Sequence, residues 1–233
     1  MSKLNTALIT GSSEGIGRSF AEVYAKNGHN LVLVARNAVK LEEFAAELRD
    51  KYDIKVAVFA ADLIPVDAAT KLFAAIAAQD IQIDILVNNA GIFHNETFAD
   101  MDFAAIEKQI SVNSIAPIRI THALQQSLGI DAKVAMITSR MGSIADNGSG
   151  GYIGYRMSKA ALNAASVSLA HELKDKKIAV GLFHPGFVQT QMVNFAGDIS
   201  PETAAERLIK RIDELNLSNT GGFWHSNGET LPW

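Results

Sequence analysis

Short apolar runs alternate with amphipathic segments along the whole chain. The apolar runs, which are typical of buried strands, cover 7–9, 30–35, 55–60, 83–87, 133–138 and 178–183. Apolar residues at helical spacing lie between them, over 18–25, 39–49, 68–78 and 152–173, and from about 103, 116 and 201 onward. Nearly continuous apolar strands that alternate with helices indicate a parallel sheet covered on both faces. The pattern predicts an α/β fold with a doubly wound sheet, whose ligands bind beyond the carboxyl ends of the strands.

Composition and charge exclude several classes of protein. Of the 233 residues, 48% are hydrophobic and 20% are charged, which indicates a globular chain and excludes a disordered one. A net charge of −4 without basic clusters argues against binding to nucleic acid or a membrane surface. The chain has no cysteine, which excludes disulfides, thiolate metal sites and a cysteine nucleophile. The apolar run that ends at Gly11 is too short for a signal segment or a membrane span, so a cytoplasmic protein is expected.

A glycine-rich turn, T-G-S-S-E-G-I-G over 10–17, joins the first predicted strand to the first predicted helix. Gly11 permits a tight turn, Gly15 lets the main chain approach a pyrophosphate, and Gly17 lets the helix pack against the strand. The free N–H groups at the start of the helix would face the anion. The turn therefore indicates a nucleotide site, and the alternative is a glycine-rich turn between two core elements.

Polar residues follow the second, third and fourth predicted strands, at the sheet edge where a ligand would lie. Arg36 stands where an acidic residue would bind a ribose 2′-hydroxyl, and its planar guanidinium suits a 2′-phosphate instead. This indicates NADP, with a solvated surface arginine as the alternative. Asp62 would accept a hydrogen bond from an adenine amino group or cap a helix. The N-N-A-G segment over 88–91 suits a backbone that touches a ribose, although a plain turn would look similar.

Tyr155 and Lys159 lie four positions apart and therefore share one face of the predicted helix. A phenol with a pKa near ~10 is a poor base at neutral pH. A cation about 4 Å away at a partly buried site is worth on the order of 4 kcal/mol, which would lower the pKa of the phenol by up to ~3. Ser139 follows the fifth predicted strand, where its hydroxyl could polarise a carbonyl oxygen. These residues together predict acid–base chemistry near neutral pH.

Six motifs occur in the order found in the short-chain dehydrogenase/reductase family. They are T-G-S-S-E-G-I-G, N-N-A-G, S-V-N at 111–113, T-S-R-M-G at 138–142, Y-R-M-S-K at 155–159 and H-P-G-F-V-Q-T at 184–190. The chain resembles this family over its whole length, which implies a single-domain Rossmann fold over 1–233 with a parallel sheet of about seven strands. The resemblance implies a catalytic tetrad of Asn113, Ser139, Tyr155 and Lys159. Tyr155 would donate a proton and Ser139 would orient the substrate oxygen. Lys159 would lower the tyrosine pKa and hold the nicotinamide ribose, and Asn113 would support a water-linked proton relay.

The resemblance also implies a site for NADP(H) along the strand ends. Its residues would be Gly11, Ser12, Ser13, Gly15, Ile16, Gly17, Arg36, Asp62, Leu63, Asn89, Ala90, Gly91, Tyr155, Lys159, Pro185, Gly186, Val188 and Thr190. The second half of the chain, over roughly 134–233, is similar to C-factor and sniffer-like carbonyl reductases. Residues 186–200 would form a short loop on the substrate side.

The expected substrate pocket is mostly aromatic. Its residues would be Phe93, His94, Met141, Tyr152, Phe187, Met192 and Phe195, although core residues of these types would look the same. No metal site is expected, because His184 and His225 have no neighbouring ligands at metal spacing.

Two features depart from the family pattern. Glu14 precedes the second glycine of the turn, where its carboxylate would repel a 2′-phosphate unless it points to solvent. Ser139 precedes Tyr155 by 16 residues, a longer spacing than is usual in the family, so the glycine-rich segment 143–154 must form a loop over the pocket. Ser143 is therefore an alternative to Ser139 as the active hydroxyl, and the Ser-x-x-Gly pattern favours Ser139.

These features predict an NADPH-dependent oxidoreductase that reversibly reduces a ketone or aldehyde of small size to an alcohol. Two rival functions stay open. One is a reductase of carrier-bound 3-oxoacyl groups, and the other is a nucleotide-binding signalling protein whose turnover is incidental.

A homodimer or homotetramer is also expected. Members of the family pair through the helix before the fifth strand and the helix that carries the active tyrosine. The small apolar residues of this last helix, Ala160, Ala161, Ala164, Ala165 and Val167, are more than one face needs. The alternative is a helix fully buried inside the monomer.

Overall fold

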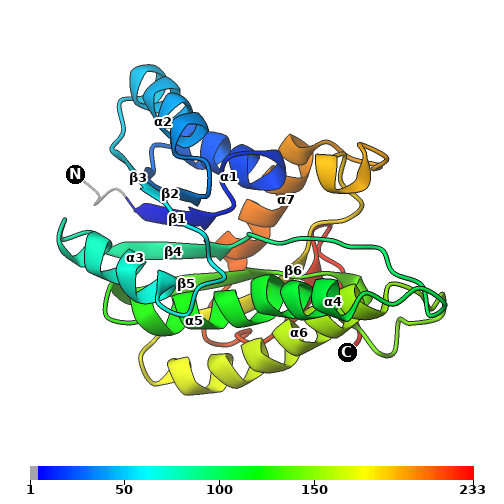
Figure 1. Ribbon diagram of the computed structural model, residues 1–233. Helices are drawn as coiled ribbons and strands as arrows, with labels where there is room; N and C mark the ends of the chain where they lie inside the picture. The colour runs from blue at the N-terminus through cyan, green and yellow to red at the C-terminus, as the bar shows by residue number, and fades with distance from the viewer. Residues whose placement is uncertain (1–4) are drawn as a thin grey trace.

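The computed structural model describes residues 5–233, in which one seven-stranded sheet separates two layers of helices (Figure 1). The strands are β1 (Thr6–Thr10), β2 (Asn30–Ala35), β3 (Val56–Ala60), β4 (Ile83–Asn88), β5 (Leu128–Ile137), β6 (Ala179–His184) and β7 (Phe223–His225). The α-helices are α1 (Gly15–Lys26), α2 (Ala38–Tyr52), α3 (Ala68–Ala77), α4 (Phe103–Ile110), α5 (Ala116–Leu124), α6 (Ile153–Lys174) and α7 (Pro201–Glu214). The predicted doubly wound, Rossmann-like α/β fold is confirmed. Residues 1–4, which begin the segment expected to carry no signal sequence, lie outside the described range.

All neighbouring strands pair in parallel, in the order β3-β2-β1-β4-β5-β6-β7. In the centre of the sheet, Leu8 of β1 pairs with Val32 of β2 on one side and with Leu86 of β4 on the other. The order of the strands along the chain reverses between β1 and β4. In open α/β sheets, such a reversal creates the crevice in which ligands bind.

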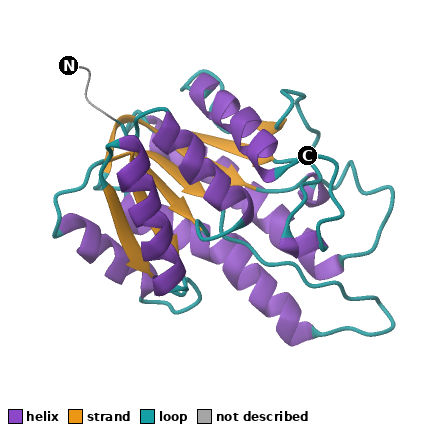
Figure 2. Cartoon of the chain, turned by 90° about the horizontal axis from the view of Figure 1, so that it is seen from above, coloured by secondary structure: helices purple, strands orange, loops and turns teal. Residues whose placement is uncertain are grey.

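Each face of the sheet carries its own apolar core. Helices α1, α2 and α7 cover one face, where Phe20, Phe44 and Leu208 are buried. Helices α3, α5 and α6 cover the other face, where Leu72 and Leu124 are buried. Figure 2 shows the strands between these layers of helices. Because both faces are covered, the strands can be apolar throughout, as the sequence pattern requires. In the described part of the chain, no helix is long and apolar enough to cross a membrane.

The structure differs from the predicted elements at three places. Strand β5 begins at Leu128, well before residue 133. The sequence pattern missed its first residues because the exposed Asp131 interrupts the apolar run. Strand β7 spans only three residues, too few for a periodicity to be recognised. Residues Ser111–Ile115 form a short π-helix between α4 and α5, where the sequence predicts ordinary helices. Single π-turns often lie at functional sites, and this one carries the predicted Asn113.

Candidate active site

A cavity of about 1060 Å³ lies beyond the carboxyl ends of the strands. Most of the residues predicted to bind the cofactor line it. They are Gly11, Ser13, Gly15, Ile16, Arg36, Asp62, Leu63, Asn89, Ala90, Gly91, Tyr155, Lys159, Pro185 and Thr190. Four other predicted cofactor residues, Ser12, Gly17, Gly186 and Val188, are not part of the lining.

The glycine turn brings the ends of β1 and β4 into direct contact. The Thr10 hydroxyl accepts hydrogen bonds from the N–H groups of Asn89 and Ala90, each at 3.0 Å. Gly11 has a φ of 67°, and a Cβ there would lie 2.9 Å from Cα of Ala90. A Cβ on the buried Gly17 would lie 2.1 Å from the Gly11 carbonyl oxygen. These positions therefore require glycine, and Thr10 is a structural residue of the site that the sequence reading passed over.

Helix α1 begins at this turn without a side-chain cap. Glu14 occupies the N-cap position, is exposed, and makes no side-chain hydrogen bond to the first turn. The first N–H groups of a helix have no intrahelical partner, so they are available to an anion. Across the cavity, a Cβ on Gly15 would lie 3.4 Å from the Thr190 side chain. The turn thus leaves an open main chain at a helix N-terminus, which fits the phosphates of a dinucleotide.

Two cations line the part of the cavity that lies between the end of β2 and the start of α2. Arg36 and Lys40 are exposed, and no carboxylate among residues 5–233 lies within ion-pair distance of either. Arg18 also lines the cavity, but its guanidinium is 2.9 Å from Glu47 and 3.8 Å from the centroid of the Phe44 ring. The sequence reading missed Lys40, although its place in the first turn of α2, four residues after Arg36, was a usable signal.

Three of the predicted catalytic side chains meet where β5 ends and α6 begins. Ser139 follows β5 by two residues, and its hydroxyl is close enough to the Tyr155 phenol to act on the pKa of that phenol. The same hydroxyl accepts the N–H of Met141 at 3.1 Å. The Ser143 hydroxyl instead accepts the N–H of Asp146 at 3.0 Å, within the loop. Of the two serines considered from the sequence, Ser139 is therefore the one that contacts the phenol.

The ammonium group of Lys159 is buried one helical turn after Tyr155. Its Nζ donates a hydrogen bond to the Ile137 carbonyl oxygen at 2.9 Å and lies 5.8 Å from the centroid of the Tyr155 ring. Burial lowers the pKa of Lys159 to about 8.

The expected effect of Lys159 on the pKa of Tyr155 is not found. Burial raises the pKa of the Tyr155 phenol to about 12, and the hydrogen bond to Ser139 opposes this rise only in part. Desolvation disfavours the charged form of a phenol, and it sets the direction of the shift here. Tyr155 is therefore protonated at neutral pH and is disposed to donate a proton.

Asn113 lies in the π-helix, and its side chain is held by hydrogen bonds to Ile92 and Ser158. Its Oδ1 accepts the Ile92 N–H at 2.8 Å, and its Nδ2 donates to the Ile92 carbonyl oxygen at 2.9 Å and to the Ser158 hydroxyl at 3.0 Å. A Cβ on Gly91 would lie 3.3 Å from Asn113 Oδ1 and 4.0 Å from Lys159 Nζ. Asn113 and Lys159 therefore both lie beside Gly91 of the N-N-A-G segment.

The predicted substrate residues are only partly brought together. Met192 and Phe195 line the cavity. The Phe93 ring stands edge-on to Tyr155, with 5.1 Å between centroids, and also contacts Tyr152 at 5.6 Å. Five of the seven are not part of the cavity lining, namely Phe93, His94, Met141, Tyr152 and Phe187.

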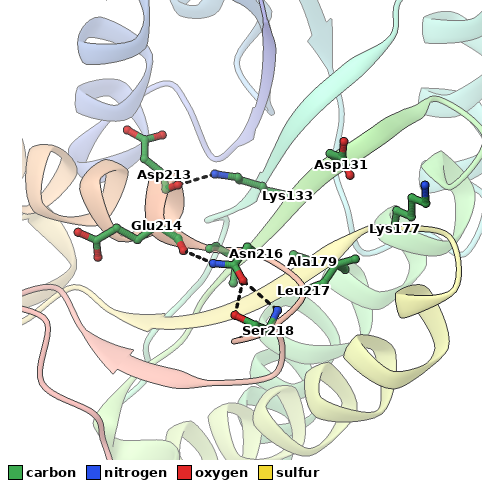
Figure 3. Close-up of a pocket in the computed structure, with 10 residues that line it drawn as sticks. Asp131, Lys133, Lys177, Ala179, Asp213, Glu214, Asn216, Leu217 and Ser218 are labelled. Carbon is green, nitrogen blue, oxygen red and sulfur yellow. Dashed lines mark hydrogen bonds between the residues drawn. The ribbon is translucent and has the colours of Figure 1, made fainter.

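A second hollow, of about 540 Å³, opens at the opposite edge of the sheet (Figure 3). Its charged groups are of both signs, and Lys133 Nζ donates to the backbone oxygen of Asp213 at 2.7 Å. None of the predicted site residues lines it. The candidate active site is therefore the larger of these two cavities, which joins the glycine turn to Tyr155.

The family model of short chain dehydrogenases matches residues 5–201, and the chain belongs to this family. Among curated proteins, a 1-hydroxy-2-glutathionyl-2-methyl-3-butene dehydrogenase of Rhodococcus sp. (strain AD45) is 32% identical over 238 residues, which cover 99% of this chain and 100% of that protein. The C-signal protein of Myxococcus xanthus is 37% identical over 154 residues, or 65% of this chain and 93% of that protein.

Solved structures of carbonyl reductases have the same fold. Carbonyl reductase Sniffer of D. melanogaster is 27% identical and superposes with a TM-score of 0.87 over 99% of this chain and 100% of that one. The NADPH-bound carbonyl reductase from chicken fatty liver is 22% identical, with a TM-score of 0.89 over 99% of each chain. The resemblance to C-signal and Sniffer-like proteins is confirmed. The protein is therefore an oxidoreductase that acts on a small molecule with a nucleotide cofactor.

Proposed function

We propose that the protein is an NADPH-dependent reductase that converts a ketone or aldehyde into an alcohol, reversibly, with Tyr155 as the proton donor. The observation that carries this proposal is the place of Tyr155, which lines the same cavity as the glycine turn and lies near Ser139. Reduction of a carbonyl needs a proton for the oxygen as well as a hydride for the carbon. A neutral phenol can supply that proton at physiological pH.

Each side chain at this end of the cavity has a separate task. Tyr155 donates its phenolic proton to the substrate oxygen, and the Ser139 hydroxyl orients that oxygen. Lys159 holds the ribose next to the nicotinamide through its ammonium group. Asn113, fixed by its three hydrogen bonds, lies beside Lys159 and supports the return of a proton to the phenol. When bound, the nicotinamide supplies the hydride.

Residues at the opposite end of the cavity support NADPH as the preferred cofactor. Arg36 and Lys40 are cations without an ion-pair partner among residues 5–233, and a 2′-phosphate would pair with them. Glu14 is exposed at the N-cap of α1, so it can turn its carboxylate to solvent. The related chicken carbonyl reductase is described as NADPH bound. The homomeric assembly and the cytoplasmic location stay predictions.

The test separates binding from turnover. Tyr155→Phe removes one hydroxyl from a ring on a long helix, so the fold and the glycine turn should persist. NADPH affinity, measured by fluorescence titration, should stay within about threefold of the parent. Turnover of any carbonyl accepted in a panel of aldehydes, ketones and 3-oxo esters should fall by about 10²–10⁴. Parent-level turnover in Tyr155→Phe would refute the assignment of the proton donor.

A further inference from the structure

Glu96 is a buried carboxylate that has no cationic partner among residues 5–233. It lies in the loop between β4 and α4 and is only 3% exposed. Within residues 5–233, no ion pair includes it. Burying a carboxylate is costly unless hydrogen bonds compensate for the lost hydration. A hydrogen bond to Glu96 is therefore needed to offset the cost of its burial.

The hydrogen-bond partner of Glu96 is the N–H of Gly154, the residue directly before Tyr155. Helix α6 begins at Ile153, and Tyr152 at its N-cap has a φ of 53° and provides no side-chain cap. The first N–H groups of a helix need partners from outside it, and the positive end of the helix dipole favours an anion there. Glu96, from 58 residues earlier in the chain, supplies the cap that Tyr152 does not. Figure 1 shows the β4–α4 connection running to the end of the molecule where α6 begins.

Gln109 of α4 also lies beside Gly154. Its Oε1 accepts the N–H of His94 at 3.0 Å, which ties the loop to α4. A Cβ on Gly154 would lie 2.5 Å from Glu96 Oε1 and 2.9 Å from Gln109 Nε2, so both side chains pack directly on this glycine. The first turn of α6 is thus bound by Glu96 through a hydrogen bond and packs against the buried Gln109.

We propose that Glu96 is a positioning residue for Tyr155. By holding the Gly154 N–H, it fixes the first turn of α6 and hence the place of the phenol relative to Ser139. This inference rests on the proposed role of Tyr155 as proton donor. Displacements of about 1 Å at a reacting group cost roughly 10²-fold in rate, so loss of the cap should be visible in turnover.

The experiment compares two substitutions of similar volume. Glu96→Gln keeps an oxygen that can accept the Gly154 N–H, whereas Glu96→Met fills the site without an acceptor. We expect kcat for an accepted carbonyl to stay within about threefold of the parent in Glu96→Gln. In Glu96→Met it should fall by about 10- to 100-fold, with NADPH affinity nearly unchanged. Asp102→Ala, which removes the side-chain cap of α4, is the control and should keep parent-level kcat.

Two further measurements distinguish positioning from a general loss of stability. In the Tyr155→Phe background, Glu96→Met should change the residual rate by less than about twofold, because residues that act through one another are not additive. Hydrogen exchange of the Gly154 amide should accelerate in Glu96→Met but not in Glu96→Gln. If Glu96→Met does not fold, Glu96→Asp replaces it in the experiment. Its shorter side chain moves the acceptor away from the Gly154 N–H, so the same effects should appear to a smaller extent.

The outcomes separate this inference from the proposed function. If Tyr155→Phe is impaired but Glu96→Met turns over like the parent, the positioning role is wrong and the proton donor stands. The positioning role is also wrong if Glu96→Met lowers the residual rate of Tyr155→Phe by the full factor. If Tyr155→Phe itself keeps parent turnover, the proposed function fails first.

Discussion

Lys159 and Tyr155 stand one turn apart in α6, yet the ammonium group is directed to the Ile137 carbonyl oxygen and lies 5.8 Å from the centroid of the phenol ring. Burial therefore acts on each group separately and in opposite directions. It raises the pKa of Tyr155 to about 12 and lowers that of Lys159 to about 8. Tyr155 therefore keeps its proton at neutral pH, whereas Lys159 loses its proton at a pH only slightly above neutral.

The first prediction concerns pH. The kcat/KM for NADPH reports ionisations of the free enzyme. Below pH 8 Lys159 is charged in the folded protein, and above it the proton is lost, so kcat/KM should fall as the pH rises through about 8. Tyr155 should add no inflection below about pH 11, because its pKa is near 12. Steady-state rates between pH 6.5 and 9.5 would show this.

Substitutions at Lys159 provide the controls for the pH profile. Lys159→Arg keeps a charge over this whole range, so its weaker activity should not fall near pH 8. Lys159→Met should lose the inflection together with cofactor affinity. An inflection near pH 8 that persists in Lys159→Met would assign it to another group.

The second prediction concerns the choice of cofactor. Arg36→Ala should lower kcat/KM for NADPH by about tenfold or more, since a charge-assisted contact to phosphate contributes on the order of 1.5–3 kcal/mol. NADH has no 2′-phosphate, so its kcat/KM should change little. Lys26→Ala removes the same charge from an exposed site that does not line the cavity and should affect neither cofactor. Equal losses for NADPH and NADH in Arg36→Ala would contradict a 2′-phosphate contact.

Residues at strand ends could be placed from the sequence alone. In a parallel sheet, the residue that follows each strand lies at the same edge, so Arg36, Asp62 and Ser139 were expected to converge. Periodicity also located the helix that bears Tyr155, because its apolar spacing runs over many turns.

Contacts between distant segments could not be placed in this way. Glu96 meets Gly154 through a loop that has no periodic pattern, and 58 residues separate the two positions. The pKa of Tyr155 depends on how completely the phenol is desolvated, which no spacing in the sequence specifies. The distance from Lys159 to Tyr155 was expected from helical geometry, but the hydrogen bond to Ile137 turns the ammonium group toward β5.

The third prediction concerns packing at the glycine turn. Gly17→Ala would place a Cβ 2.1 Å from a backbone oxygen of Gly11, which cannot move without shifting the turn. Overpacking of this kind costs about 1–3 kcal/mol or more, so the urea midpoint should fall and NADPH binding should weaken. The matched control is Gly148→Ala, where a Cβ would meet no atom within 4 Å. Equal midpoints for the two variants would show that the turn relaxes freely.

The last prediction concerns assembly, which the resemblance implies and the exposed face of α6 supports. Ala161 and Ala164 are exposed and Met157 is 48% exposed, so this helix is not fully buried inside the monomer. An outward stripe of small and apolar side chains allows close contact with a second copy of the helix. Ala164→Arg should disrupt that contact, because the long charged side chain would be forced into an apolar interface. Light scattering should then report 25.0 kDa in place of a multiple of that mass. Ala77→Arg, at an exposed site on α3, should leave the assembly intact. A parent protein that is only 25.0 kDa at working concentration would rule out this interface.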